Sequence, residues 1–283
     1  MKAGFQIGEF KFAISCPDTL PFPANMAGFQ IPLEEGMYEY RIELTASFPE
    51  PNSKLINDRG NLQVYDDHGY EIRYIRLKGR NELYGYYHEI SDKEARILFN
   101  QEYISLYHLD PVFVSLLVLE KYMIAKGSLT LHCAYMNHNG RAILFSAPSE
   151  TGKTTQANLW KQYRGCDTVN GDRALLRQID GTWHACGWPV CGSSGVCHNK
   201  ELPVEAIVML SQAPTNRIEL LHPMKAFSQV YSQITINRWN NSAHTKAMDL
   251  IEHLVGSVPV YHLACNISED AVICLEDALT RII

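Results

Sequence analysis

Residues 131–160 read LHCAYMNHNGRAILFSAPSETGKTTQANLW, and this stretch sets the expectation for the fold. Apolar residues alternate with others from Leu129 to Met136, Asn139-Gly140 is typical of tight hairpin turns, and a second apolar run follows at 141–146. The pattern predicts two antiparallel strands. A loop at 147–152 then leads into a helix that continues through Leu159 and Trp160.

The loop between this strand and this helix has the context of a nucleotide phosphate loop. Backbone amides in such a loop, with the helix N-terminus behind them, attract phosphate oxygens. Lys153 adds a positive charge near the β- and γ-phosphates, and the hydroxyl of Thr154 is suited to ligating Mg²⁺. The predicted phosphate-binding residues are Ser149, Thr151, Gly152, Lys153, Thr154 and Thr155. An ordinary loop that opens a helix is the weaker alternative.

The loop departs from the general phosphate-loop pattern at two positions. Ala147 stands where the first glycine is usual, and Glu150 stands where a small residue is usual. A carboxylate beside phosphates is repulsive unless it points away or meets a metal.

A second acidic group is expected nearby to hold the metal. Asp172 comes eighteen residues after Thr154, which leaves room for one helix and a return strand. We therefore predict Asp172 and Thr154 as the metal ligands. The alternative is an acid in an ordinary Asn-Gly-Asp turn at 170–172.

The run 131–176 resembles the catalytic domain of HPr kinase/phosphorylase and, more distantly, the ATP-dependent phosphoenolpyruvate carboxykinases. It is most similar to HPr-kinase-like proteins found near peptide-modification genes in bacteria. The resemblance extends over residues 128–283 and implies a mixed α/β fold, a P-loop nucleotide-binding domain of the carboxykinase type, and ATP and Mg²⁺ as cofactors.

Carried over by position, the resemblance implies catalytic roles for His132, Lys153 and Asp172. His132 matches a histidine close to the transferred phosphoryl group, although a histidine packed in the sheet is nearly as good an interpretation. Asp172 matches the second acid of an Asp-Asp pair, whose first member, a general base, is replaced by Gly171.

A Gly/Ser loop at about the position of Gly192, Ser193 and Ser194 faces the phosphate site in the resembling proteins, which makes these residues a tentative substrate loop. A plain turn between strands is an equal alternative. Arg173 is suited to neutralising transferred charge, although a solvated surface residue is the preferred interpretation.

The remaining chain divides into three predicted regions. Residues 1–105 form a β-rich N-terminal domain with a hairpin across 62–77, residues 106–127 form a connecting segment with one helix from Asp110 to Gly127, and residues 128–283 form the P-loop domain. Within the last region we predict strands at 204–210, 217–221 and 258–263 and helices at 223–234, 243–255 and from 268 onward.

Composition excludes some classes of protein. The 283 residues are 46% hydrophobic, which excludes a disordered chain. The net charge of −6 argues against a nucleic-acid binder, which normally carries a basic face, but it allows a small phosphate pocket. Neither a secretory signal nor a membrane-spanning run is recognisable, so a cytoplasmic protein without membrane contact is expected.

Three functions remain open at this point. The first is an ATP-dependent kinase that transfers the γ-phosphate to a serine hydroxyl of a peptide or small protein, with the N-terminal domain as a docking module. The second is a catalytically impaired nucleotide-binding or sensing protein, because Gly171 and Glu150 replace expected residues. Carboxykinase-like chemistry is a weaker third. The resemblance also implies a possible homo-oligomer.

Overall fold

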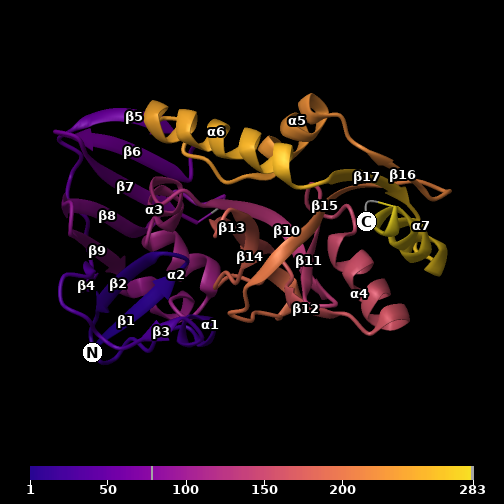
Figure 1. Ribbon diagram of the computed structural model, residues 1–283. Helices are drawn as coiled ribbons and strands as arrows, with labels where there is room; N and C mark the ends of the chain where they lie inside the picture. The colour runs from indigo at the N-terminus through magenta and orange to yellow at the C-terminus, as the bar shows by residue number, and fades with distance from the viewer. Residues whose placement is uncertain (78, 282–283) are drawn as a thin grey trace. The chain divides into compact units, whose positions relative to one another are not determined.

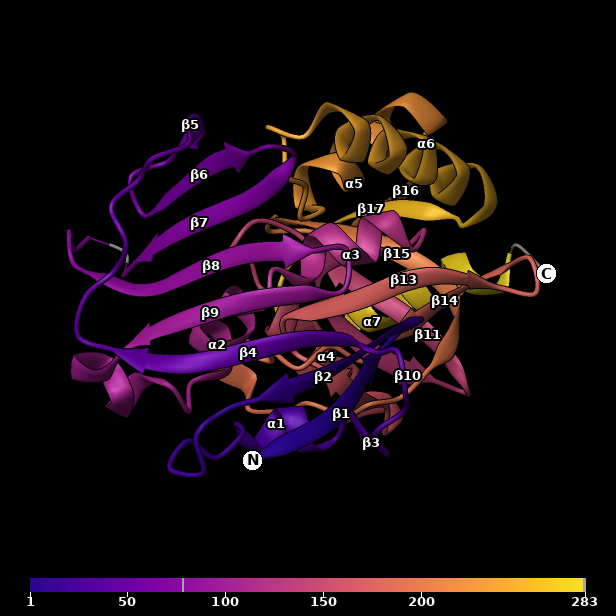
Figure 2. The same cartoon turned by 90° about the vertical axis from the view of Figure 1, so that its left-hand side faces the viewer.

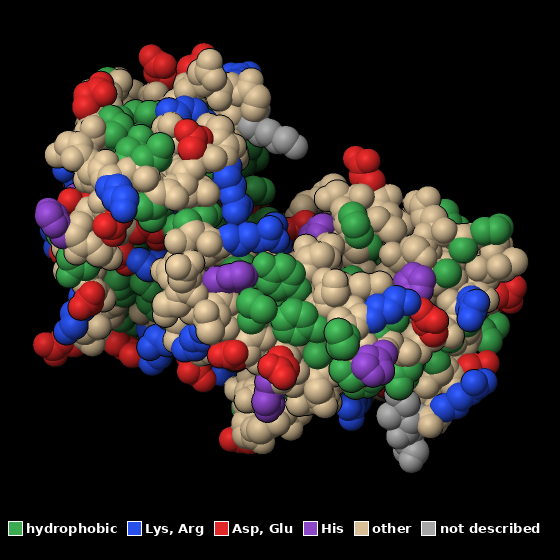
Figure 3. All heavy atoms as spheres, turned by 90° about the horizontal axis from the view of Figure 1, so that it is seen from above, with side chains coloured by type: hydrophobic (Ala, Val, Ile, Leu, Met, Phe, Trp, Pro, Cys, Tyr) green, Lys and Arg blue, Asp and Glu red, His purple; other side chains and the backbone are tan. Residues whose placement is uncertain are grey.

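The computed structural model describes residues 1–77 and 79–281 and contains two compact units, Met1–Leu119 and Glu120–Ile283. Each unit is built on a large mixed sheet, so the chain is a mixed α/β protein as predicted. None of the described helices is long and apolar enough to cross a membrane. On the face shown in Figure 3, acidic and basic side chains are interspersed.

The N-terminal unit is a nine-stranded sheet in the order β3-β1-β2-β4-β9-β8-β7-β6-β5 (Figure 2). Its strands are β1 (Lys2–Ile7), β2 (Phe10–Ser15), β3 (Gln30–Ile31), β4 (Tyr38–Thr45), β5 (Lys54–Asp58), β6 (Leu62–Asp67), β7 (Tyr70–Arg76), β8 (Leu83–Ser91) and β9 (Glu94–Asn100). Short helices accompany them: α1 (Ala24–Ala27), the 3-10 helix η1 (Gln101–Leu106) and α2 (Asp110–Leu116).

This unit confirms the prediction of a β-rich region with a hairpin. Strands β6 and β7 are antiparallel, with Asp67 opposite Tyr70 at the turn. Aromatic side chains fill the core, and Phe12 packs edge-on against Tyr40 with ring centroids 5.4 Å apart. Such pairs favour β structure because their flat faces pack well on a pleated surface.

The prediction of one helix from Asp110 to Gly127 is wrong. The segment forms two short helices, α2 and α3 (Leu119–Ala125), separated at Val118, whose φ is 51°. The hydroxyl of Tyr40 donates a hydrogen bond to the carbonyl oxygen of Leu117 at 2.7 Å. In a continuous helix this oxygen would instead accept a hydrogen bond from a backbone amide of the same helix. The local apolar pattern does not indicate this distant partner.

The C-terminal unit contains an eight-stranded sheet among the described residues. Its strands are β10 (Leu129–His138), β11 (Arg141–Ser146), β12 (Asp167–Asn170), β13 (Arg173–Ile179), β14 (Thr182–Cys186), β15 (Leu202–Gln212), β16 (Arg217–Leu220) and β17 (Val260–Cys265). Its helices are α4 (Lys153–Arg164), the 3-10 turn η2 (Gly192–Ser194), α5 (Pro223–Gln233), α6 (Asn241–Ser257) and α7 (Glu269–Thr280). The strands and helices predicted after residue 200 are therefore confirmed.

Strand β10 is shared between two sets of partners. Its first half pairs with β13 and its second half with β11 and β12, in each case antiparallel. The predicted hairpin before the loop 147–152 is thus confirmed. On its other side β11 is parallel to β15, which is parallel to β17.

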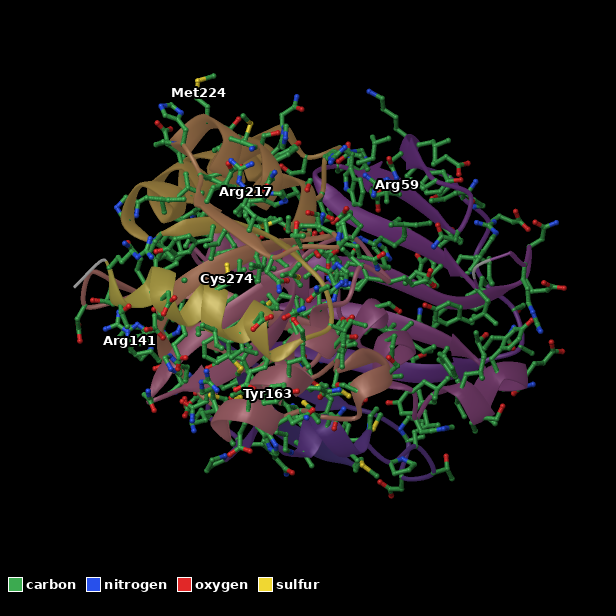
Figure 4. All side chains as sticks on the ribbon, turned by 90° about the vertical axis from the view of Figure 1, so that its right-hand side faces the viewer. Arg59, Arg141, Tyr163, Arg217, Met224 and Cys274 are labelled. Carbon is green, nitrogen blue, oxygen red and sulfur yellow. The ribbon has the colours of Figure 1, made fainter. Side chains whose placement is uncertain are left out.

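Helices cover both faces of this sheet (Figure 1). Side chains of α5 and α6 pack on one face with Leu144 of β11, and side chains of α4 and α7 pack on the other with Phe145. Figure 4 shows Tyr163 of α4 and Cys274 of α7 on this second side. Because β11 is buried on both faces, its sequence is a nearly continuous apolar run.

A substitution at Phe145 tests whether this packing stabilises the strand that leads into the loop. Its side chain is fully buried, so Phe145→Ala should lower the free energy of unfolding by about 3–5 kcal/mol, measured by urea denaturation. Met224 is 79% exposed, and the control Met224→Ala should change stability by less than about 0.5 kcal/mol. Equal effects of the two substitutions would contradict the described core.

Candidate functional site

The loop from β11 to α4 has an unusual backbone conformation at two residues. Glu150 has a φ of 66° and Gly152 a φ of 117°, so both lie in the left-handed region. Glycine is suited to this conformation, and at Gly152 it makes the turn that starts the helix. The carbonyl oxygen of Gly152 accepts the first hydrogen bond of α4, from the amide of Gln156 at 2.9 Å.

Lys153 is the first residue of α4 and is 8% exposed. Its ammonium donates to the carbonyl oxygens of Ala147 at 3.0 Å and Pro148 at 3.1 Å, so the loop encloses it. Burial lowers the pKa of Lys153, and the Asp172 carboxylate opposes that shift. The enclosed Lys153 ammonium therefore interacts electrostatically with the Asp172 carboxylate.

The other predicted loop residues remain accessible. Ser149 and Thr154 are exposed, and Thr151, Gly152 and Thr155 are partly buried. Thr154 and Thr155 occupy the first turn of α4, where amides without a helical partner point outward. The geometry leaves their hydroxyls and amides open to a ligand.

Strand β10 places His132 beside Asp172. The pairing of β10 with β13 sets His132 opposite Arg173, and the amide of Cys133 donates to the carbonyl oxygen of Asp172 at 3.0 Å. His132 Nε2 lies 3.8 Å from Asp172 Oδ1. Burial and then the charge on Lys153 lower the pKa of His132, which keeps its ring neutral near pH 7. The structure thus brings together the three predicted catalytic residues.

The turn before Asp172 is fixed by Asn170, a residue whose role sequence reasoning missed. Its buried amide donates to the carbonyl oxygens of Trp188 at 2.8 Å and Val190 at 3.1 Å. Its Oδ1 accepts from the backbone amides of Asp172 at 2.8 Å and Arg173 at 3.0 Å. The Asn-Gly-Asp sequence is a signal for such an Asn-stabilised turn.

The expectation that Arg173 is a solvated surface residue is wrong. Its Nε lies 3.0 Å from Asp172 Oδ2, and its Nη1 donates to Thr235 Oγ1 at 2.8 Å. The segment after α5 is held on β10, because the amide of Thr235 donates to the carbonyl oxygen of Thr130 at 3.0 Å. No local pattern reveals that residues more than sixty positions apart meet here.

Gln233, at the end of α5, fixes the ring of His132. His132 Nδ1 lies 3.3 Å from Gln233 Oε1, and Gln233 Nε2 donates to Ser232 Oγ at 3.0 Å. Because Oε1 only accepts, Nδ1 carries the proton of the neutral ring and Nε2 keeps its lone pair. That lone pair is on the nitrogen closer to Asp172.

The turn η2 packs against Gly171 and Asp172. A Cβ atom on residue 171 would lie 2.0 Å from Ser194 Oγ, and one on residue 192 would lie 3.1 Å from Asp172 Oδ1. Ser194 Oγ donates to the carbonyl oxygen of Cys191 at 2.7 Å, while Ser193 is exposed. The predicted substrate loop therefore lies at Asp172, and Ser194 occupies the space of a side chain at 171.

A cavity of about 550 Å³ opens beside the loop 147–152. Glu150, Thr151 and Gly152 contribute one part of its lining, and residues at and just after the ends of β15 and β17 contribute another. Among residues 1–77 and 79–281, no group of three or more His, Cys, Asp and Glu side chains is arranged to hold a metal ion.

The packing of Ser194 on Gly171 predicts how a side chain at 171 is tolerated. Gly171→Asp should lower the free energy of unfolding by about 1–3 kcal/mol, because the new side chain overlaps Ser194. Ser194→Gly should recover about 1 kcal/mol or more of this loss in the double variant, measured by thermal denaturation. Ser193→Gly is the matched control and should recover nothing. Equal recovery with both glycines would contradict the described packing.

The pKa of His132 is the second testable property of the site. Because Lys153 lowers this pKa and Asp172 raises it, Lys153→Met should move the NMR titration of His132 to higher pH. Asp172→Asn should move it to lower pH. If neither substitution shifts the titration, His132 does not sense these charges.

Comparisons with known proteins give a family and similar solved structures. No curated protein matches the chain. The HPr(Ser) kinase/phosphatase from Coxiella burnetii is a similar solved structure, with 13% identity, a TM-score of 0.32, and coverage of 54% of this chain and 88% of that chain. The profile of a family described as SynChlorMet cassette protein ScmC matches residues 106–276. The chain therefore belongs to the ScmC family of SynChlorMet cassette proteins.

Proposed function

We propose that the chain binds Mg-ATP at the loop 147–155 and transfers the γ-phosphate to a serine hydroxyl of a peptide or small protein. The observation that carries the proposal is the convergence of Lys153, Asp172 and His132 from three separate segments. An enclosed cation, a carboxylate and a neutral histidine at the mouth of a phosphate-type loop form a set suited to phosphoryl transfer.

The loop residues account for the binding of the triphosphate. The amides of Thr151 to Thr155 and the N-terminus of the 12-residue helix α4 supply dipoles that attract phosphate oxygens. Lys153 adds the point charge. To reach a γ-phosphate, its ammonium exchanges the carbonyl oxygens of Ala147 and Pro148 for phosphate oxygens.

The donor set at this site fits Mg²⁺ held partly by the nucleotide. Asp172 offers a carboxylate and Thr154 an exposed hydroxyl, and Mg²⁺ accepts one or two protein ligands when water and phosphate oxygens complete its shell. When bound, the ion neutralises charge on the β- and γ-phosphate oxygens. Arg173 holds the Asp172 carboxylate in place.

His132 is suited to receive the proton of the acceptor hydroxyl. Its Nε2 lone pair is available because Nδ1 carries the ring proton and donates it in a hydrogen bond to Gln233 Oε1. In the transfer step the serine oxygen forms a bond to the γ-phosphorus as the bond from that phosphorus to the bridging oxygen of ADP breaks. The hydroxyl proton passes to His132 Nε2, so a base at residue 171 is not required.

A second candidate is a nucleotide-binding or sensing protein that does not transfer phosphate. The packing of Ser194 over Gly171 favours this candidate, because it leaves no room for a carboxylate at the position of the first acid. The two candidates share the same nucleotide site. They differ only in whether labelled phosphate reaches a peptide.

Lys153→Ala tests the shared nucleotide site. The substitution should weaken Mg-ATP binding at least about tenfold in calorimetry, because a charge-assisted contact to phosphate is lost. Lys161→Ala, an exposed lysine on the same helix, is the matched control and should bind like the unchanged protein. Unchanged binding by Lys153→Ala would contradict the proposal. Transfer of label from γ-labelled ATP to serine peptides favours the kinase, and binding without transfer favours the sensor.

A further inference from the structure

The cavity beside the phosphate loop lies where ligands bind in parallel sheets. Leu210 near the end of β15 and Ile267 after β17 line it, and both strands belong to the parallel group that contains β11. Ligands of open α/β sheets occupy the crevice at the carboxyl ends of such strands. A volume of about 550 Å³ is in the range of small-molecule sites.

The far wall of this cavity is largely apolar. Leu210 and Pro214 contribute to it, and Ile267 is 77% exposed, which is unusual for a large aliphatic side chain. An apolar surface that stays open to solvent beside polar groups suits the face of a planar heterocycle. The loop side is tied to this wall, because Gln212 Nε2 donates to the carbonyl oxygen of Thr151 at 3.3 Å.

Gln156 adds a buried acceptor that lacks a donor. It lines the cavity and is 3% exposed, and its Nε2 donates to Cys265 Sγ at 3.2 Å and to the carbonyl oxygen of Asn266 at 3.1 Å. Within the described residues its Oε1 has no hydrogen-bond partner. A buried acceptor without a donor is unfavourable, and a ligand amino group would satisfy it once the side chain turns its Oε1 toward the cavity.

Glu150 is the acidic residue of the loop 147–152 at this cavity. It lines the cavity and is exposed, and its φ of 66° turns the backbone at this point of the loop. Beside phosphates its charge would be repulsive, whereas beside a sugar its two oxygens accept hydrogen bonds from neighbouring hydroxyls.

We propose that this cavity binds the nucleoside of a purine nucleotide that carries an exocyclic amino group, with Glu150 accepting hydrogen bonds from the ribose hydroxyls. This inference rests on the proposed nucleotide-binding function. It assigns the base to the wall formed by Pro214 and Ile267 and its amino group to Gln156. Glu150, an unusual residue in a phosphate loop, thereby becomes a determinant of specificity for a ribose.

The experiment compares three ligands in the presence of Mg²⁺: ATP, 2′,3′-dideoxyATP and inorganic tripolyphosphate. Calorimetry gives the dissociation constants for the full chain and for Glu150→Gly, a substitution compatible with the left-handed backbone. The unchanged protein should prefer ATP to dideoxyATP by about tenfold or more. Glu150→Gly should remove this preference and leave tripolyphosphate binding within about twofold. Glu252→Gln, an exposed acid on α6, is the control and should keep the preference.

A second variant tests the wall that receives the base. Ile267→Asp should weaken ATP binding and leave tripolyphosphate binding unchanged, because only the nucleoside contacts this residue. Circular dichroism checks that both variants keep the fold.

Four outcomes overturn the inference, and they are distinguishable. If ATP and dideoxyATP bind equally to the unchanged protein, the ribose is not recognised. If Glu150→Gly strengthens ATP and tripolyphosphate binding alike, Glu150 faces the phosphates. If neither ATP nor tripolyphosphate binds, the proposed function fails together with the inference. If tripolyphosphate binds but Ile267→Asp leaves ATP binding unchanged, the phosphate-binding loop stands and only the nucleoside site is removed.

Discussion

The candidate site depends on keeping an ammonium and a carboxylate close together in a partly buried place. A charge removed from water is unfavourable unless other groups compensate it, and here Lys153 is enclosed by loop carbonyls while Asp172 is paired with Arg173. Strand β10 makes this possible, because its two halves pair with β11, which leads into the loop, and with β13, which follows Asp172. The arrangement therefore follows from one strand that has two sets of partners.

Local patterns predict the parts of the molecule whose causes are local. The Asn139-Gly140 turn, the apolar run of β11 and the glycine at 152 each favour one backbone form, and the structure has those forms. Residues held by distant partners are not predictable in this way. The break at Val118 depends in part on the hydroxyl of Tyr40, and the place of Arg173 depends on the segment after α5.

The departures from the general phosphate-loop motif have physical counterparts in the structure. Gly171 replaces an expected acid, and the side chain of Ser194 fills the space that an acid would need. Glu150 replaces an expected small residue, and it lines the cavity beside the loop. The ScmC family profile matches residues 106–276, which include positions 150, 171 and 194. In other members that have a side chain at 171, we expect a smaller residue at 194.

A crystal structure of the full chain grown with magnesium and a non-hydrolysable ATP analogue tests the central claim most directly. The account predicts phosphate oxygens within hydrogen-bond distance of the amides of 151–155, the Lys153 ammonium turned from the loop carbonyls onto the phosphates, and Asp172 facing the metal. A nucleotide bound elsewhere, with Lys153 still bonded to Ala147 and Pro148, would contradict it.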